Sequence, residues 1–186
     1  YESDLSDENL DAIEKAMLTI VEVAEETLQN GVIDMGAVIM IDEEDVNFAM
    51  GMQLTNPKKL ESAVKELSKM AEEQAPGELE VNLNSGSYKD VTFHTINVDL
   101  STGPDQMQEV LGSSIAMVIG IGMDTAYMGV GTNPESIIKK AMDASAKSKG
   151  KGKSQSPAMA MSFNLVPMLE MAARVNDDPM MDTLID

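Results

Sequence analysis

The chain has 186 residues, and 32 acidic against 13 basic side chains give it a formal net charge of −19. It contains 17 methionines, one histidine and no cysteine, which excludes disulfide scaffolds, zinc fingers, cysteine catalysis and multi-histidine metal sites. An acidic chain repels phosphate groups, so we expect no nucleic acid among its partners.

The length fits one domain, and we expect residues 1–186 to form a single unit. No apolar run is long enough to cross a bilayer, so we expect no membrane span. The chain begins at Tyr1 rather than Met and stops at Asp186 within an expected helix, so we expect a piece excised from a longer protein. No motif calls for a cofactor, and we expect none.

The first elements are a helix and a hairpin. Residues 7–30 place apolar side chains at three- and four-residue steps, which predicts a helix that ends at Gly31. The predicted buried stripe of this helix consists of Leu10, Ile13, Met17, Ile20, Ala24 and Leu28. Residues 33–41 are a nearly continuous apolar run, and residues 46–54 alternate as a half-buried strand does. The acidic turn 42–45 joins these two strands into a hairpin.

A second helix and a second hairpin follow. Asn56 and Pro57 predict the start of a helix whose buried stripe consists of Leu60, Val64, Leu67 and Ala71. Residues 79–83 and 88–100 predict two strands joined by a turn at 85–87. The second of these strands changes phase between Phe93 and Ile96, so we expect a β-bulge near His94 and Thr95.

A helical turn at 105–111 precedes a third hairpin, formed by strands 115–123 and 125–132. Asn133 and Pro134 then open another helix. Its buried residues are predicted to be Ile137, Ile138, Ala141 and Met142. Residues 147–156 are rich in Lys, Gly and Ser and predict a mobile loop. A last strand carries Met159, Met161, Phe163 and Leu165, and it leads into a helix that begins at Pro167.

Strand, tight turn, strand ending in Met-Gly, Thr-Asn-Pro and helix occur in the same order at 37–72 and at 115–147. This shared order predicts an internal repeat. We therefore expect an α+β fold: a curved antiparallel sheet of about seven strands, built from two hairpin–helix repeats, with helices mainly on one face.

Several residues are candidates for catalysis. His94 is the only histidine, and the favoured interpretation is a half-exposed structural residue beside a bulge rather than a general base. Ser62 with Lys65 and Ser136 with Lys139 match the Ser-x-x-Lys spacing of penicillin-recognising enzymes. The other motifs of those enzymes are absent, so we interpret both pairs as helical surface residues.

Other patterns indicate packing or solvation. Gly120, Gly122, Gly129 and Gly131 lie within strands, which favours close helix packing over a dinucleotide site. The acidic groups at 42–45 and 177–182 lack the spacing of a calcium loop, so we expect solvated turns and no metal.

The methionines give the remaining signal. They line the predicted apolar faces of the strands, where core filling is the favoured interpretation, because a thioether adapts to irregular gaps. Such a face can also admit an apolar ligand. The candidate ligand-binding residues are Met50, Met52, Met117, Ile119, Met159 and Met161.

The order of elements in 35–70, in 113–146 and in the segment 162–167 resembles exported bacterial proteins of unknown function that repeat hairpins and single helices along a curved sheet. The architecture is similar, more distantly, to half-barrel lipoprotein carriers. The first resemblance implies a location in the periplasm or cell envelope, and the second implies an apolar pocket between sheet and helices.

Three functions follow from these observations. The first is a non-catalytic exported or envelope domain that binds another protein or serves as a structural module. The second is a carrier of lipid-like or other apolar ligands. The third and weakest is a hydrolase that uses His94. The sequence leaves the oligomeric state open.

Overall fold

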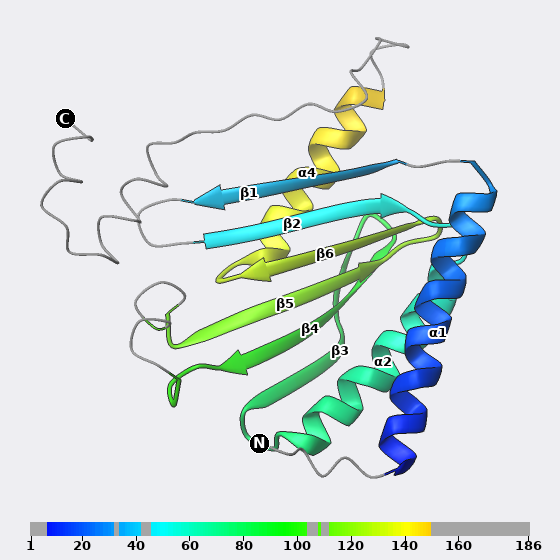
Figure 1. The fold of residues 1–186 in the computed structure, drawn as a ribbon. Helices are drawn as coiled ribbons and strands as arrows, with labels where there is room; N and C mark the ends of the chain where they lie inside the picture. The colour runs from blue at the N-terminus through cyan, green and yellow to red at the C-terminus, as the bar shows by residue number, and fades with distance from the viewer. Residues whose placement is uncertain (1–6, 32–33, 42–45, 104–107, 109–111, 150–186) are drawn as a thin grey trace, which may run out of the picture.

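The computed structural model describes residues 7–31, 34–41, 46–103, 108 and 112–149 (Figure 1). Three helices and six strands alternate along this part of the chain. Their bounds are α1 (Asp7–Gln29), β1 (Met35–Ile41), β2 (Val46–Gln53), α2 (Pro57–Gln74), β3 (Leu79–Tyr88), β4 (Val91–Asp99), β5 (Ser114–Ile121), β6 (Thr125–Gly131) and α4 (Pro134–Lys149).

The six strands form one antiparallel sheet in the order β1-β2-β6-β5-β4-β3. The expected α+β class and antiparallel sheet are confirmed. The loop expected at 147–156 is wrong for residues 147–149, which end α4. The rest of that loop, the expected last strand at 159–165, the helix after it and most of the helical turn at 105–111 lie outside the described residues.

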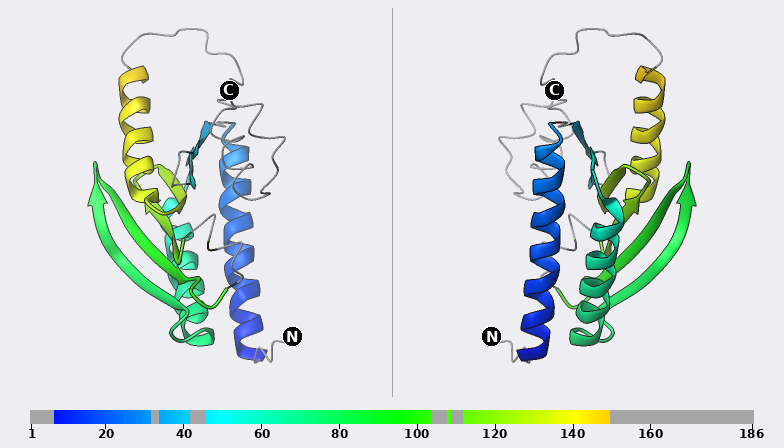
Figure 2. Two further views of the ribbon diagram at one scale, coloured as in Figure 1. Left: turned by 90° about the vertical axis from the view of Figure 1, so that its left-hand side faces the viewer. Right: turned by 90° about the vertical axis from the view of Figure 1, so that its right-hand side faces the viewer.

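The helices cover both faces of the sheet. Figure 2 shows α1 and α2 on one side of the curved sheet and α4 on the other, within its hollow. The expectation of helices mainly on one face therefore holds for α1 and α2 and is wrong for α4.

The core on the α4 side joins α4 to β2, β4 and β5, with partly buried tyrosines of β3 and β6 packed against it. The predicted apolar residues Ile137, Ile138 and Met142 are buried there, together with Phe93 of β4 and Ala49 of β2. Gly129 lets α4 approach β6, because a Cβ atom at this position would lie 2.9 Å from the Pro134 Cβ and 3.0 Å from the Ile138 Cδ1. Close helix packing over this glycine is confirmed.

The core on the other side is smaller. Val23 of α1 packs there with Leu54, Ile121 and Ala126, and Leu60 of α2 contacts the same cluster. Together, α1 and α2 cover only one end of this face (Figure 1).

The second hairpin differs from its prediction in two ways. Its turn is Lys89-Asp90, with φ of 48° and 64°, the two positive values that a type I′ turn requires. The expected turn at 85–87 lies within β3 instead. A register shift lies opposite His94, as expected near His94 and Thr95, but its extra residues are in β3, between Asn82 and Gly86, whereas β4 pairs with β5 without interruption.

The physical reason is that β4 is covered on both sides. Val91 and Phe93 pack in the α4 core, and Ile96 lies on the opposite face with Met117 as its partner in β5. A strand between two helix layers carries apolar residues on both faces and needs no change of phase.

Candidate functional site

The predicted ligand-binding residues of β2 and β5 lie on one face of the sheet. Met50 of β2 pairs with Met128 of β6, which pairs in turn with Ile119 of β5. Met117 pairs with Val130 in the next row. Side chains alternate along a strand, so Met50, Met52, Met117 and Ile119 all face the side of α1 and α2. The other two predicted residues, Met159 and Met161, lie outside the described residues.

The helices bury this face unevenly. Met52 and Ile119 pack against the core around Val23. Farther from α1, a group of apolar side chains stays half-buried, and we call this group the open face. It consists of Val46, Phe48, Met50, Met117, Met128 and Val130. Figure 1 shows that α1 and α2 do not cross this part of the sheet, whereas α4 crosses it on the opposite face.

A second apolar surface follows α1. The side chains of Leu10, Met17, Val21 and Leu28 are 49%, 53%, 51% and 58% exposed. With 3.6 residues per turn they lie along one flank of the helix together with Ala24, and we call these five residues the α1 stripe. An exposed apolar row of this length on a helix is typical of a surface that contacts a partner.

The apolar stripe predicted for this helix shares four residues with the α1 stripe, and it has Ile13 and Ile20 in place of Val21. The residues of α1 that are buried are Ala16 and Val23, at 1% and 2% exposure, and they face α2 and the sheet. The width of the apolar sector of α1 could have shown that some of its apolar residues are buried and others exposed. One neighbouring helix covers the sector of Ala16 and Val23, and the α1 stripe extends beyond it.

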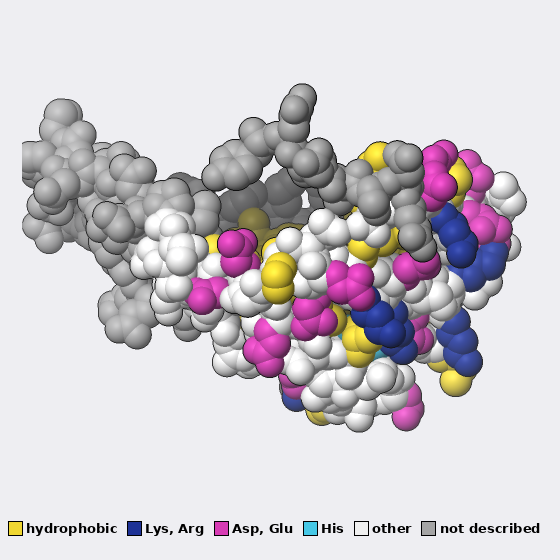
Figure 3. Space-filling view, turned by 90° about the horizontal axis from the view of Figure 1, so that it is seen from below, with side chains coloured by type: hydrophobic (Ala, Val, Ile, Leu, Met, Phe, Trp, Pro, Cys, Tyr) yellow, Lys and Arg dark blue, Asp and Glu magenta, His cyan; other side chains and the backbone are white. Residues whose placement is uncertain are grey.

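Acidic side chains border the α1 stripe. Glu14 falls one turn from Leu10 and Met17, and Glu25 falls one turn from Val21 and Leu28. The whole of α1 contains one lysine against seven acidic residues. Figure 3 shows acidic side chains spread over the face seen from below, with hydrophobic side chains exposed among them. The electrostatic field at this surface therefore favours a cationic partner.

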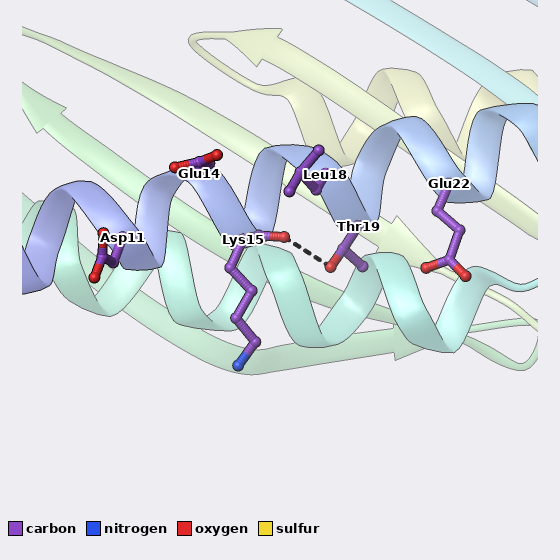
Figure 4. A pocket seen from close by; sticks show the side chains of 6 residues that line it. All are labelled: Asp11, Glu14, Lys15, Leu18, Thr19 and Glu22. Atoms are coloured by element: carbon purple, nitrogen blue, oxygen red, sulfur yellow. Dashed lines mark hydrogen bonds between the residues drawn. The ribbon is translucent and has the colours of Figure 1, made fainter.

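The other side of α1 has a shallow, mainly polar surface depression. Asp11, Lys15 and Glu22 project from one side of it and Glu14 and Leu18 from another, and the Thr19 hydroxyl donates to the Lys15 carbonyl oxygen at 2.9 Å (Figure 4). A helix surface of this kind offers no convergent polar groups for a small ligand. The polar lining of this depression differs from the apolar α1 stripe on the same helix.

His94 is fully buried, so the interpretation as half-exposed is wrong. Its Nδ1 accepts the backbone N–H of Asn84 at 3.1 Å, within the register shift of β3. The Nε2 atom lies 3.4 Å from the Glu61 carboxylate and has no hydrogen bond. Burial lowers the pKa of His94, and the nearby Lys65 lowers it further against an opposing effect of Glu61. A neutral ring sealed from solvent positions the bulge and cannot reach a substrate in this conformation.

The Ser-x-x-Lys pairs hold no catalytic geometry. The Ser62 hydroxyl donates to the Lys58 carbonyl oxygen, and Lys65 binds Glu61 at 2.6 Å, which lowers the pKa of Glu61. Lys139 binds Glu135 at 2.5 Å. Both lysines therefore form ion pairs along their own helices.

Among the described residues, no group of His, Asp and Glu side chains could hold a metal ion, and the acidic segments 42–45 and 177–182 lie outside that part. Within the same part, no helix is long and apolar enough to cross a membrane.

No protein-family model, curated protein or solved structure matches this chain. The resemblances drawn from the order of elements therefore stay predictions.

Proposed function

We propose that the chain is a non-catalytic domain that binds an amphipathic segment of another protein through the α1 stripe and the open face. The observation that carries the proposal is the α1 stripe, four of whose large apolar side chains are about half exposed or more beside an acidic border. Amphipathic helices bind such surfaces through apolar residues at three- and four-residue spacing. The acidic border favours a partner with basic residues beside its apolar side chains.

The arrangement favours this function over a carrier of apolar ligands. Carriers enclose most of the ligand in a cavity with apolar walls. The open face is a half-buried surface with helices at one end, and the depression on α1 is lined mainly by charged and polar side chains. An extended partner gains more contact from a surface of this shape than a small ligand does.

We infer that the fold contains the predicted hairpin–helix repeat. Met50 and Met128 precede the glycines of the two Met-Gly pairs, and they are direct partners in the sheet. The two hairpins thus meet through equivalent positions, as two copies of one hairpin related by a local twofold axis do, while the helices that follow them, α2 and α4, lie on opposite faces of the sheet. This arrangement places both methionines at the centre of the open face.

The test uses two synthetic helical peptides of equal length, one of Leu and Lys and one of Leu and Glu, and measures binding by fluorescence anisotropy. We expect the Leu/Lys peptide to bind and the Leu/Glu peptide not to bind. Met17→Asp combined with Val21→Asp should weaken binding roughly 30-fold, because two half-exposed apolar contacts contribute about 1 kcal/mol each.

A matched control separates apolar contact from charge. Leu18 is 62% exposed on the same helix but lies on the side of the polar depression. The control carries Leu18→Asp and Thr19→Asp, so it adds two charges to α1 as the first variant does. The proposed function predicts that the control binds within about twofold of the wild type, and equal weakening by both variants would refute it.

A further inference from the structure

Strand β1 forms one edge of the sheet and is apolar on both faces. Met35 and Ile39, on the side of α1, are 61% and 64% exposed, and Val38 and Met40, on the side of α4, are 36% and 39% exposed. The strand contains no charged residue and no proline. A long apolar edge of this kind is a template for another strand.

The opposite edge, β3, carries the protection that β1 lacks. Its register shifts between Asn82 and Gly86, and Glu80, Asn82 and Asn84 are exposed polar residues along it. Bulges and charges are the usual means by which proteins prevent pairing at a sheet edge. The contrast between the two edges indicates that the β1 edge pairs with a further strand.

The backbone groups that would accept this strand can be assigned. The Gln53 N–H donates to the Asp34 carbonyl oxygen at 2.8 Å, and hydrogen-bonded pairs alternate along an antiparallel ladder. Gly36 and Val38 therefore bond to β2, whereas Ala37 and Ile39 direct their N–H and C=O groups toward the free edge.

We propose that residues 158–166 of the same chain pair with β1 as the seventh strand of the sheet. Their sequence, Ala-Met-Ala-Met-Ser-Phe-Asn-Leu-Val, alternates large apolar with small or polar residues. Figure 1 shows α4 crossing behind β1 and reaching past this strand in that view, and Figure 2 shows the end of α4, at Lys149, standing off the sheet on the α4 side. Eight residues separate Lys149 from Ala158 and span at most about 26–29 Å, slightly more than the roughly 23 Å of a seven-residue strand.

Tethering favours this segment over the β1 of a second copy. A segment joined by a short linker has an effective concentration in the millimolar range, far above that of a second molecule at micromolar protein. The alternation also fits the site, because small residues would face the end of α4 while Met159 and Met161 would extend the open face. The inference concerns the edge of the sheet and stands whether or not the face binds a peptide.

The experiment is amide hydrogen exchange on the full chain, read at single residues by NMR. Pairing at the free edge predicts that the Ala37 and Ile39 amides exchange on the order of 100-fold slower than unprotected amides. Met161→Pro with Ser162→Pro removes one ladder bond in either register, and it should return both amides to near the unprotected rate. The Val38 amide, bonded to β2, should stay protected in both proteins and report that the sheet is intact.

The control variant is Gln155→Pro, which introduces a proline in the linker and should leave Ala37 and Ile39 protected. Fast exchange of both amides in the wild type would overturn the proposal. Protection that survives the double proline variant, or that rises with protein concentration, would assign the edge to a second copy and would overturn it equally.

Discussion

Replacing His94 by phenylalanine tests the role of the single histidine. The ring is buried, its Nδ1 accepts the Asn84 N–H at 3.1 Å, and burial lowers its pKa from the ordinary value of 6.5. His94→Phe keeps the approximate size and shape of the ring but removes the acceptor. The Asn84 N–H then loses its partner, which costs about 1–3 kcal/mol of unfolding free energy for a buried donor. Asn84 is itself exposed, so we expect a loss near the lower end, about 1 kcal/mol.

The pH dependence has a definite sign. As the pH falls through 6.5, the unfolded chain takes up a proton at this histidine, whereas the folded chain, with its lowered pKa, does not. The unfolded state then binds more protons, so the contribution of His94 to stability is complete above pH 6.5 and declines below it. One proton limits the slope to about 1.4 kcal/mol per pH unit.

The assay is urea unfolding of wild type and His94→Phe between pH 5 and pH 7.5. The wild-type chain has a net charge of −19, and the relief of repulsion at low pH changes both proteins alike, so the difference between them isolates the histidine. We expect the wild type to lose stability relative to the variant as the pH falls. A difference that is independent of pH, or one that grows in the opposite direction, would refute the assignment of a neutral buried ring.

Two further predictions concern the packing of α4. Ile138→Ala should lower the unfolding free energy by about 2–5 kcal/mol in urea denaturation, because this side chain is fully buried, and a loss below 1 kcal/mol would contradict the α4 core. Gly129→Val should lower the unfolding free energy by about 1–3 kcal/mol or more, since its Cβ would lie 2.9 Å from the Pro134 Cβ. Gly36→Val, with nothing within 4 Å of its Cβ, should leave the thermal midpoint nearly unchanged. Equal effects of the two glycine substitutions would show that α4 does not press on β6.

The sequence predicted elements with a single periodicity well. The stripe of α4, the end of α1 at Gly31 with φ of 71°, and the hairpin strands of β1, β2, β5 and β6 agree with the structure. In each of these cases one local pattern decides the outcome, because helix and strand periods differ.

The failures arise where the structure depends on what covers a surface. β4 shows apolar residues on both faces because it lies between two helix layers, and a single strand sequence does not reveal how many layers will cover it. The turn at Lys89-Asp90 uses left-handed conformations without the Asn or Gly that usually marks them, so Ser85-Gly86-Ser87 gave a stronger turn signal.

Only part of the candidate site was predicted, because the sequence does not show which surfaces are covered. The sequence placed Met50, Met52, Met117 and Ile119 on apolar strand faces, and the structure brings all four to one face. The sequence could not show which end of that face stays uncovered. The α1 stripe was found by its period and assigned to the core, since periodicity reports that a surface is apolar and does not report whether it is covered.

The central claim is that the α1 stripe and the open face bind an amphipathic basic segment, and methionine methyl NMR tests it most directly. The protein would be labelled at its methionine methyl groups and titrated with the Leu/Lys peptide. The account predicts shifts at Met17, Met50, Met117 and Met128, and none at Met142, which is buried between α4 and the sheet, or at Met123, which is 89% exposed in a turn. Shifts confined to Met123, or spread evenly over all methionines, would contradict it.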